Sequence, residues 1–164
     1  MGRGLSDLQK RILTIVYERR QRRDFAEEER RQKEIYSDPG YRRMLMSLHG
    51  TDAVRPYSIS DYPDAVHARV IAVLYDWPVY MWQRGRWLRP SEGGEAASGG
   101  HNFRRSKIGQ AEHNRRTASY YRAVGRLRQR GLLEAHRHGL SITTEGVRLV
   151  EELSVSNAES AGLY

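Results

Sequence analysis

The sequence contains no cysteine and no long apolar run. Without cysteine there is no disulfide scaffold, no thiolate nucleophile and no zinc or iron–sulfur site with cysteine ligands, which is consistent with a reducing, cytoplasmic location. No stretch approaches the roughly 18 to 20 apolar residues that cross a bilayer, and the N-terminal segment lacks the apolar core of a secretion signal. We therefore expect a protein that neither spans a membrane nor is secreted.

Lysine is also scarce, since only three of the 28 basic residues are lysine and 25 are arginine. Arginine presents a planar fork of donors that suits phosphates and guanine edges. A codon bias toward arginine produces the same composition, so the position of the charge carries more information than its amount. The chain has 164 residues, the size of one domain, and a formal net charge of +8.

The positive charge is concentrated in one segment. Residues 1–102 sum to +3, residues 103–130 to +8 and residues 131–164 to −3. In the middle segment nine basic residues meet a single acidic residue, Glu112. A solvated charged surface is usually mixed in sign, as residues 18–34 are with seven basic and six acidic side chains. The segment 103–130 therefore favours an anionic partner over simple solvation.

The periodicity of the first residues predicts a long N-terminal helix over 5–36. Ser6 and Gln9 have the spacing of a capping box. Apolar residues then recur at steps of three and four, at Leu5, Leu8, Ile12, Ile15 and Val16. We interpret 18–34 as a solvated extension of this helix rather than a strut that faces a partner, ended by Asp38-Pro39-Gly40.

The middle of the chain predicts one short helix within 41–62 and a second core helix over 63–77. Pro63 takes the first helical position, Asp64 lies in the first turn, and an apolar stripe follows at Val66, Val70, Val73 and Leu74. We expect 78–115 to be an insertion. It holds a hairpin whose Tyr80, Trp82 and Trp87 more often fill a core than stack on single-stranded bases, and a glycine-rich flexible loop over 91–100.

Residues 116–130 predict a helix with two different faces. Tyr120, Val124 and Leu127 share an apolar face, and the opposite face carries Ser119, Arg122 and Arg126. Gly131 suits a left-handed C-cap. One continuous helix from Ser106 is an alternative, but 112–117 offers no apolar residue to hold its first half down, which favours a break near Asn114.

The last part of the chain predicts a two-stranded hairpin and a final helix. The hairpin spans 132–142 with a tight turn at His138-Gly139. Thr143 or Thr144 caps a closing helix over 144–153, and 154–164 has the composition of a disordered tail.

The run ASYYRAVGRLRQRGL at 118–132, followed by the hairpin and by SITTEG at 141–146, resembles the winged helix-turn-helix proteins, in particular MarR-like prokaryotic regulators. In that pattern a recognition helix ending in RLxxRGL precedes a wing, an LTxEG motif and a closing helix. Ile142 stands where the family more often has Leu. The resemblance covers 117–153 and, less specifically, a first helix at 5–17, and the 78–115 insertion departs from it. The fold class implied is mainly α with a small wing (α+β), one domain over 1–153.

The resemblance implies double-stranded DNA as the partner, with the recognition helix in the major groove and the wing on the minor groove or phosphates. We predict base readout by Ser119, Tyr121 and Arg122, with Thr117 among the matched positions, and phosphate contacts by Arg115, Arg116, Arg126 and Arg128. Arg137 and His138 lie at the wing tip. Arg104, Arg105 and Lys107 extend the same footprint.

Other chemistry has weaker support in the sequence. His136 and His138, completed by His113 or His101, have the spacing of a metal site but no acidic partner motif. No phosphate-binding glycine loop, nucleophile elbow or HExxH run is present. We therefore expect no catalytic residues, no metal and no cofactor.

We expect a cytoplasmic, nucleoid-associated, sequence-specific transcription regulator, and no enzyme. A homodimer through the N-terminal helix and the closing helix is expected, because one recognition helix has a small footprint. Two alternatives stay open: a plasmid, phage or chromosome maintenance factor that uses the same fold on DNA, and a winged helix that serves as a protein-interaction module.

Overall fold

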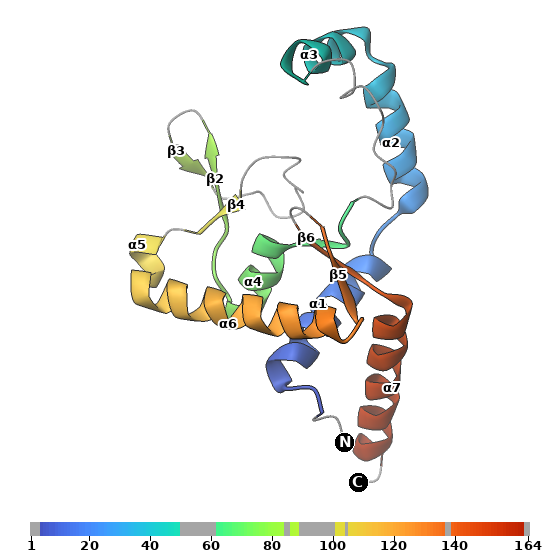
Figure 1. Ribbon diagram of the computed structural model, residues 1–164, viewed down its shortest axis with the longest axis vertical. Helices are drawn as coiled ribbons and strands as arrows, with labels where there is room; N and C mark the ends of the chain where they lie inside the picture. Colours follow the sequence, from blue (N-terminus) through green and yellow to red (C-terminus); the bar gives the residue numbers. More distant parts are fainter. Residues whose placement is uncertain are drawn as a thin grey trace.

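The computed structural model describes residues 4–49, 62–83, 86–88, 101–103, 105–136 and 139–162. Within these residues the protein is mainly helical with small antiparallel sheets, which confirms the predicted α+β class (Figure 1). In chain order the elements are α1 (Asp7–Gln21), α2 (Phe25–Ser37), α3 (Pro39–His49), β1 (Ala65–Val66), α4 (His67–Tyr75), β2 (Tyr80–Gln83), β3 (Arg86–Leu88), β4 (His101–Asn102), α5 (Arg105–Ile108), α6 (Gln110–Gln129), β5 (Leu133–Ala135), β6 (Gly139–Ile142) and α7 (Thr144–Ala161).

Helix α1 lies at the centre of the hydrophobic core, in contact with α4, α6, α7 and β6. Its start confirms the predicted capping box, because the Ser6 hydroxyl accepts from the Gln9 N–H at 3.3 Å and the Gln9 side chain accepts from the Ser6 N–H at 2.9 Å. The predicted apolar stripe of α1 is buried at Ile12, Ile15 and Val16. Apolar side chains of α4, α6, α7 and the sheet complete the core, among them Val70, Leu74, Tyr120, Leu127, Leu140 and Val150.

The prediction of one helix over 5–36 is wrong, because the chain turns between α1 and α2. Asp24 caps α2, its side chain accepting from the Glu27 N–H at 3.0 Å. Arg23, at the turn, points inward and donates to the Asp64 carboxylate at 2.8 Å. The Arg23–Asp64 ion pair and the Asp24 cap separate α1 from α2, although the charge pattern of 18–34 is compatible with one continuous helix.

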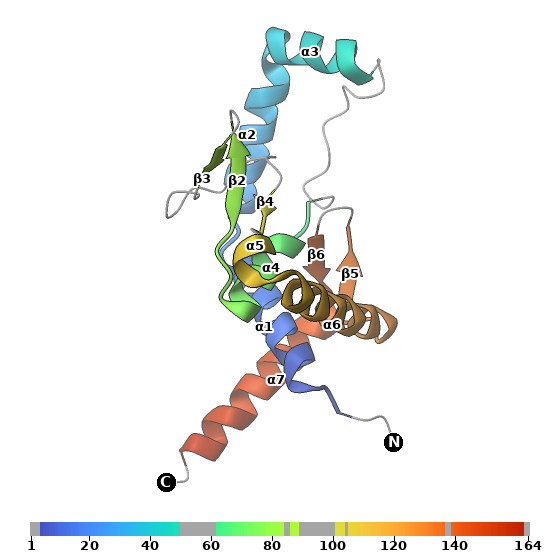
Figure 2. The same ribbon diagram turned by 90° about the vertical axis from the view of Figure 1, so that its left-hand side faces the viewer.

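Helices α2 and α3 extend away from the core (Figures 1 and 2). No residue of α2 is buried, as the interpretation of 18–34 as a solvated segment expects. Helix α2 ends at Ser37 as predicted, but Pro39 also begins α3, and the Asp38 side chain accepts from the Gly40 N–H at 2.7 Å. Helix α3 is the short helix expected within 41–62, started two residues early.

The second core helix is shorter than the predicted 63–77, since α4 spans His67–Tyr75. Asp64 does not sit in a helical turn. It lies before the strand β1, is 8% exposed, and accepts from the Ile142 N–H at 2.9 Å. Val70 and Leu74 are buried as predicted, whereas Val73 is 55% exposed.

The sheet that contains β5 and β6 has three strands, in the order β1-β6-β5, where a two-stranded hairpin was predicted. Ala65 pairs with Leu140, and Leu140 pairs with Ala135 on the other side. His136 and Gly139 exchange backbone hydrogen bonds, so Gly139 belongs to the returning strand and not to the predicted turn. Arg137 and His138, predicted at the wing tip, lie outside the described part of the chain.

The predicted hairpin in the insertion is confirmed as β2 and β3, with Trp82 paired to Trp87, and β4 adds a third strand next to β2. The side chains of Tyr80, Trp82 and Trp87, and the loop 91–100, lie outside what the structure describes.

The prediction of a disordered tail from 154 is wrong, because α7 continues to Ala161. Thr143 caps the helix, its hydroxyl accepting from the Gly146 N–H at 3.1 Å. The Ser154 and Ser160 hydroxyls donate to carbonyls one turn back, at Val150 and Ser156. Once the packed first half has nucleated the helix, each further residue adds a backbone hydrogen bond at little cost.

Candidate nucleic-acid interface

Helix α6 carries the candidate interface and is fixed to the core along one face. Its buried residues are His113, Tyr120, Ala123, Val124 and Leu127, which confirms the predicted apolar face. The Tyr120 hydroxyl lies 2.8 Å from Nδ1 of His67 on α4, and burial raises the pKa of Tyr120. At the C-terminal end Gly131 has φ +70°, the predicted left-handed cap. The opposite face of α6 is therefore held in a fixed orientation toward solvent.

The helix begins at Gln110, six residues before the predicted 116, and no break occurs near Asn114. The break lies at Gly109, whose φ of +93° favours glycine and separates α5 from α6. The alternative of one continuous helix from Ser106 is therefore also wrong.

Aromatic contacts hold the first half of α6. The His113 ring stacks on Trp77 with ring centroids 5.6 Å apart, and Phe103 lies 6.2 Å away. One turn later, the Arg116 guanidinium lies 5.2 Å from the Tyr75 ring centroid. These contacts supply the anchoring that the apolar pattern of 112–117 lacks.

Arg115 and Arg116, predicted phosphate contacts, already have a partner in Glu112. Arg116 Nε lies 2.8 Å from the Glu112 carboxylate, and Arg115 forms a second ion pair with it. Hydrogen bonds from Arg116 and Arg115 hold the pKa of Glu112 below its ordinary value. Glu112 precedes the two arginines by three and four residues, a spacing at which opposite charges pair on a helix. These two ion pairs could therefore be predicted from the sequence.

Arg122, Arg126 and Arg128 differ from this pair, because within the described residues no carboxylate lies at ion-pair distance from any of them. All three are exposed. Arg122 donates to the Ser119 hydroxyl at 3.4 Å, one turn back along the helix. The predicted segment of positive charge thus divides into arginines neutralised within the helix and arginines whose charge faces solvent.

Helix α2 provides an internal comparison. Arg30 pairs with Glu27 and Glu34, Arg31 pairs with Glu27, and Lys33 pairs with Glu29. These pairs are all at helical spacings, and α2 cancels its own charge. The second half of α6 has no acid to do the same.

The polar side chains predicted to read bases lie on different sides of α6. Tyr121 is 52% exposed, with its ring 5.4 Å from that of His67. Ser119 is partly buried and accepts from Arg122. Thr117 instead donates to the backbone oxygen of His113 at 2.7 Å, which occupies its hydroxyl proton within the helix.

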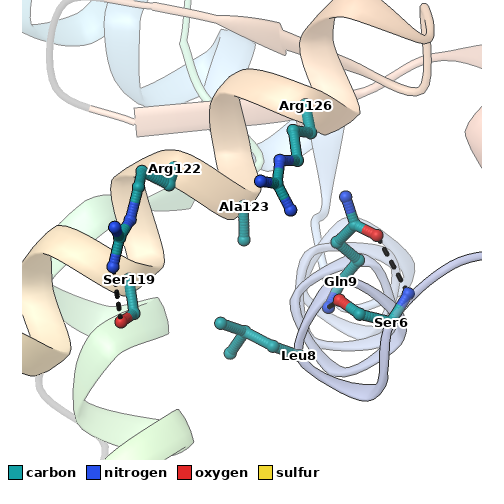
Figure 3. Close-up of a pocket in the computed structure, with 7 residues that line it drawn as sticks. All are labelled: Ser6, Leu8, Gln9, Ser119, Arg122, Ala123 and Arg126. Carbon is teal, nitrogen blue, oxygen red and sulfur yellow. Dashed lines mark hydrogen bonds between the residues drawn. The ribbon is translucent and has the colours of Figure 1, made fainter.

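A pocket of about 220 Å³ lies between α6 and the start of α1, and its α1 residues were not predicted as site residues (Figure 3). Its lining comprises Ser6, Leu8, Gln9, Ser119, Arg122, Ala123 and Arg126. The capping box was visible in the sequence, but its position beside α6 depends on tertiary packing between segments more than 100 residues apart.

A second, more open surface hollow joins α6 to β5 on the other side, between Arg128 and His136. Arg105 and Lys107, predicted to extend the footprint, are exposed on α5, and Arg104 lies outside the described residues.

Within the part of the chain that the structure describes, no group of three or more His, Asp or Glu side chains is placed to hold a metal ion. No helix in the same residues combines the length and apolar character that crossing a bilayer requires. Comparison of the chain with protein-family models, with curated proteins and with solved structures found no match.

Proposed function

We propose that the protein binds double-stranded DNA as a winged helix-turn-helix module, with α6 as recognition helix and the β5–β6 hairpin as wing. The order of the elements supports the proposal. Helices α1, α4 and α6, the β5–β6 hairpin and α7 come in the same chain order as the first helix, second helix, recognition helix, wing and closing helix of the family that 117–153 resembles, with α2 and α3 added between α1 and α4. Residues 76–109 form the insertion between the second helix and α6.

The observation that carries the proposal is the set of exposed arginines Arg122, Arg126 and Arg128, which have no carboxylate partner among the described residues, on a helix whose buried face anchors it to the core. A helix of 20 residues is about 30 Å long, and a major groove about 12 Å wide admits a helix. Cations that are not neutralised within the protein release counterions from DNA when they meet its phosphates, and this release supplies much of the affinity.

The exposure of the individual side chains supports different proposed roles. Arg122 is exposed on the face of α6 that lies opposite the buried residues and is our first candidate for pairing with guanine. Ser119 and Tyr121, on different sides of that face, are further candidates. Arg126 and Arg128 are proposed as phosphate contacts. Arg115 and Arg116 contribute less than the sequence predicted, because binding DNA through them means competing with Glu112.

The homodimer and the role in transcription stay predictions. The homodimer would use the N-terminal and C-terminal helices, of which α2 and the second half of α7 are exposed. The role as a transcription regulator, rather than a maintenance factor, depends on where in a genome the bound sequence lies.

The test of sequence reading is a selection of duplexes from a random pool by the full-length protein, followed by anisotropy titrations. Arg122→Ala should cost about 1 to 3 kcal/mol of binding free energy on the selected duplex, because a bidentate base contact is lost. Its effect on an unrelated duplex should be small.

Arg30→Ala on α2 is the matched control and should leave both affinities unchanged, because Arg30 is paired within its own helix. Equal losses on both duplexes would reassign Arg122 to phosphate contact. No binding to any duplex at low salt would contradict the proposed function and favour the protein-interaction alternative.

A further inference from the structure

The pocket between α1 and α6 has the donors of an anion site and lacks an acid. Of its seven lining residues two are arginines, two are serines, one is glutamine, and none is acidic. Figure 3 shows Arg126 reaching from α6 toward the side formed by Ser6 and Gln9, whereas Arg122 bends along α6 toward Ser119. The pocket thus brings a cation of α6 to the first turn of α1.

The Gln9 side chain adds a hydrogen-bond donor to this pocket. The residue is 6% exposed, and its Oε1 accepts from the Ser6 N–H at 2.9 Å. Among the described residues its Nε2 has no acceptor, and in Figure 3 it points toward the Arg126 side of the pocket. In a pocket without a carboxylate, this donor is available to an acceptor that is not part of the chain.

The first turn of α1 adds positive potential at the same place. The capping box satisfies the backbone N–H groups of Ser6 and Gln9, and those of Asp7 and Leu8 remain without intrahelical acceptors. The helix dipole places partial positive charge there. The nearest acid, Asp7, does not line the pocket: its side chain is 100% exposed and lies 3.9 Å from Lys10.

We propose that this pocket holds one phosphate group, bound by the Gln9 side-chain amide and the Arg126 guanidinium, and that the DNA backbone supplies it. The proposal rests on the proposed function and extends the DNA contact surface from α6 to the start of α1. Arg122 also lines the pocket, but its guanidinium turns toward Ser119 and away from Gln9 (Figure 3), so the proposed phosphate does not use it.

The test uses Gln9→Glu, which replaces the amide donor with a carboxylate and keeps an acceptor for the Ser6 N–H, as glutamate also completes a capping box. Gln21→Glu, at the exposed end of α1, is the matched control with the same change of charge. Arg126→Gln, with Arg30→Gln on α2 as its control outside the proposed DNA surface, is the second pair. Circular dichroism melting checks that all four variants fold.

Inorganic phosphate is the first probe, at constant ionic strength, with backbone amide NMR shifts of Leu8 and Ala123 as the readout. We expect saturable shifts in the wild type, Gln21→Glu and Arg30→Gln, and their loss in Gln9→Glu and Arg126→Gln. Equal, non-saturating responses in all proteins would show an adventitious ion only and overturn the proposal.

Duplex DNA is the second probe. Gln9→Glu should weaken binding about tenfold relative to Gln21→Glu, and Arg126→Gln should lower the slope of log K against log salt by about one unit. If the wild type binds inorganic phosphate but Gln9→Glu and Gln21→Glu bind DNA with equal affinity, the pocket takes free phosphate. That result would overturn the proposal that the DNA backbone supplies the phosphate group. A wild type that binds phosphate but no duplex would contradict the proposed function separately, because the phosphate titration does not involve DNA.

Discussion

At the scale of single residues, Asp64 joins three parts of the fold. Its side chain, 3% exposed, pairs with Arg23 at 2.8 Å and accepts from the Ile142 N–H at 2.9 Å. Its own N–H donates to the Ser141 hydroxyl at 3.3 Å. The sequence predicted a helix-start carboxylate here, since Pro63-Asp64 is a common beginning of a helix. It could not show that the partners lie some 40 and 78 residues away.

Asp64→Ala should destabilise the protein by about 3 kcal/mol, because removing one partner of a buried ion pair leaves an uncompensated charge. The lower end of the usual range applies, since Arg23 keeps Glu28 at 2.6 Å. Urea denaturation followed by circular dichroism measures the effect, with Glu159→Ala on the exposed end of α7 as control. A loss no larger than that of the control would show that Asp64 does not tie the turn between α1 and α2 to β6.

Gly146, in the motif that resembles the winged-helix family, also has a steric explanation. A Cβ on this residue would lie 2.3 Å from the Leu132 carbonyl oxygen and 2.7 Å from Ile142 Cγ1. The start of α7 therefore packs directly on the backbone that enters β5. The sequence contained this glycine, but only the packing gives its reason.

At the scale of elements, the sequence predicted what regular patterns encode. The core faces of α1 and of the second half of α6 were found because apolar residues recur there at helical spacing. Strand β1 was missed because two residues, Ala65 and Val66, cannot show alternation; only pairing with β6 defines the strand. The first half of α6 was missed because its anchor is His113, which no apolar pattern counts, packed on the distant Trp77.

His113→Ala should loosen the first two turns of α6 without unfolding the rest of the helix. The residue is 9% exposed, and its loss removes the ring of α6 that packs on Trp77 and Phe103. Amide hydrogen exchange at 110–116 should accelerate, while exchange at 120–127 stays slow. Asn114→Ala, at the exposed neighbouring position, is the control. Unchanged exchange at 110–116 would show that the aromatic contacts do not hold this segment.

At the scale of the whole molecule, the net charge of +8 acquires a structure. Helices α2 and α7 pair basic side chains with their own glutamates, as Arg148 does with Glu145 and Glu152. Helix α6 neutralises its first arginines through Glu112 and leaves Arg122, Arg126 and Arg128 exposed. The sequence predicted the segment and the partner class. The division of the segment into paired and unpaired arginines follows from helical spacing. The position of Gln9 beside α6 depends on tertiary packing.

The salt dependence of duplex binding measures whether the exposed arginines of α6 bind DNA. The comparison sets Arg122→Ala/Arg126→Ala/Arg128→Ala against Arg30→Ala/Arg31→Ala/Lys33→Ala, which removes the same charge from α2. We expect the α6 variant to lower the slope of log K against log salt by about two units, one for each of the proposed phosphate contacts Arg126 and Arg128, and the α2 variant to keep the wild-type slope. Equal slopes in the two variants, or a wild type that shows no duplex binding at low salt, would contradict this expectation.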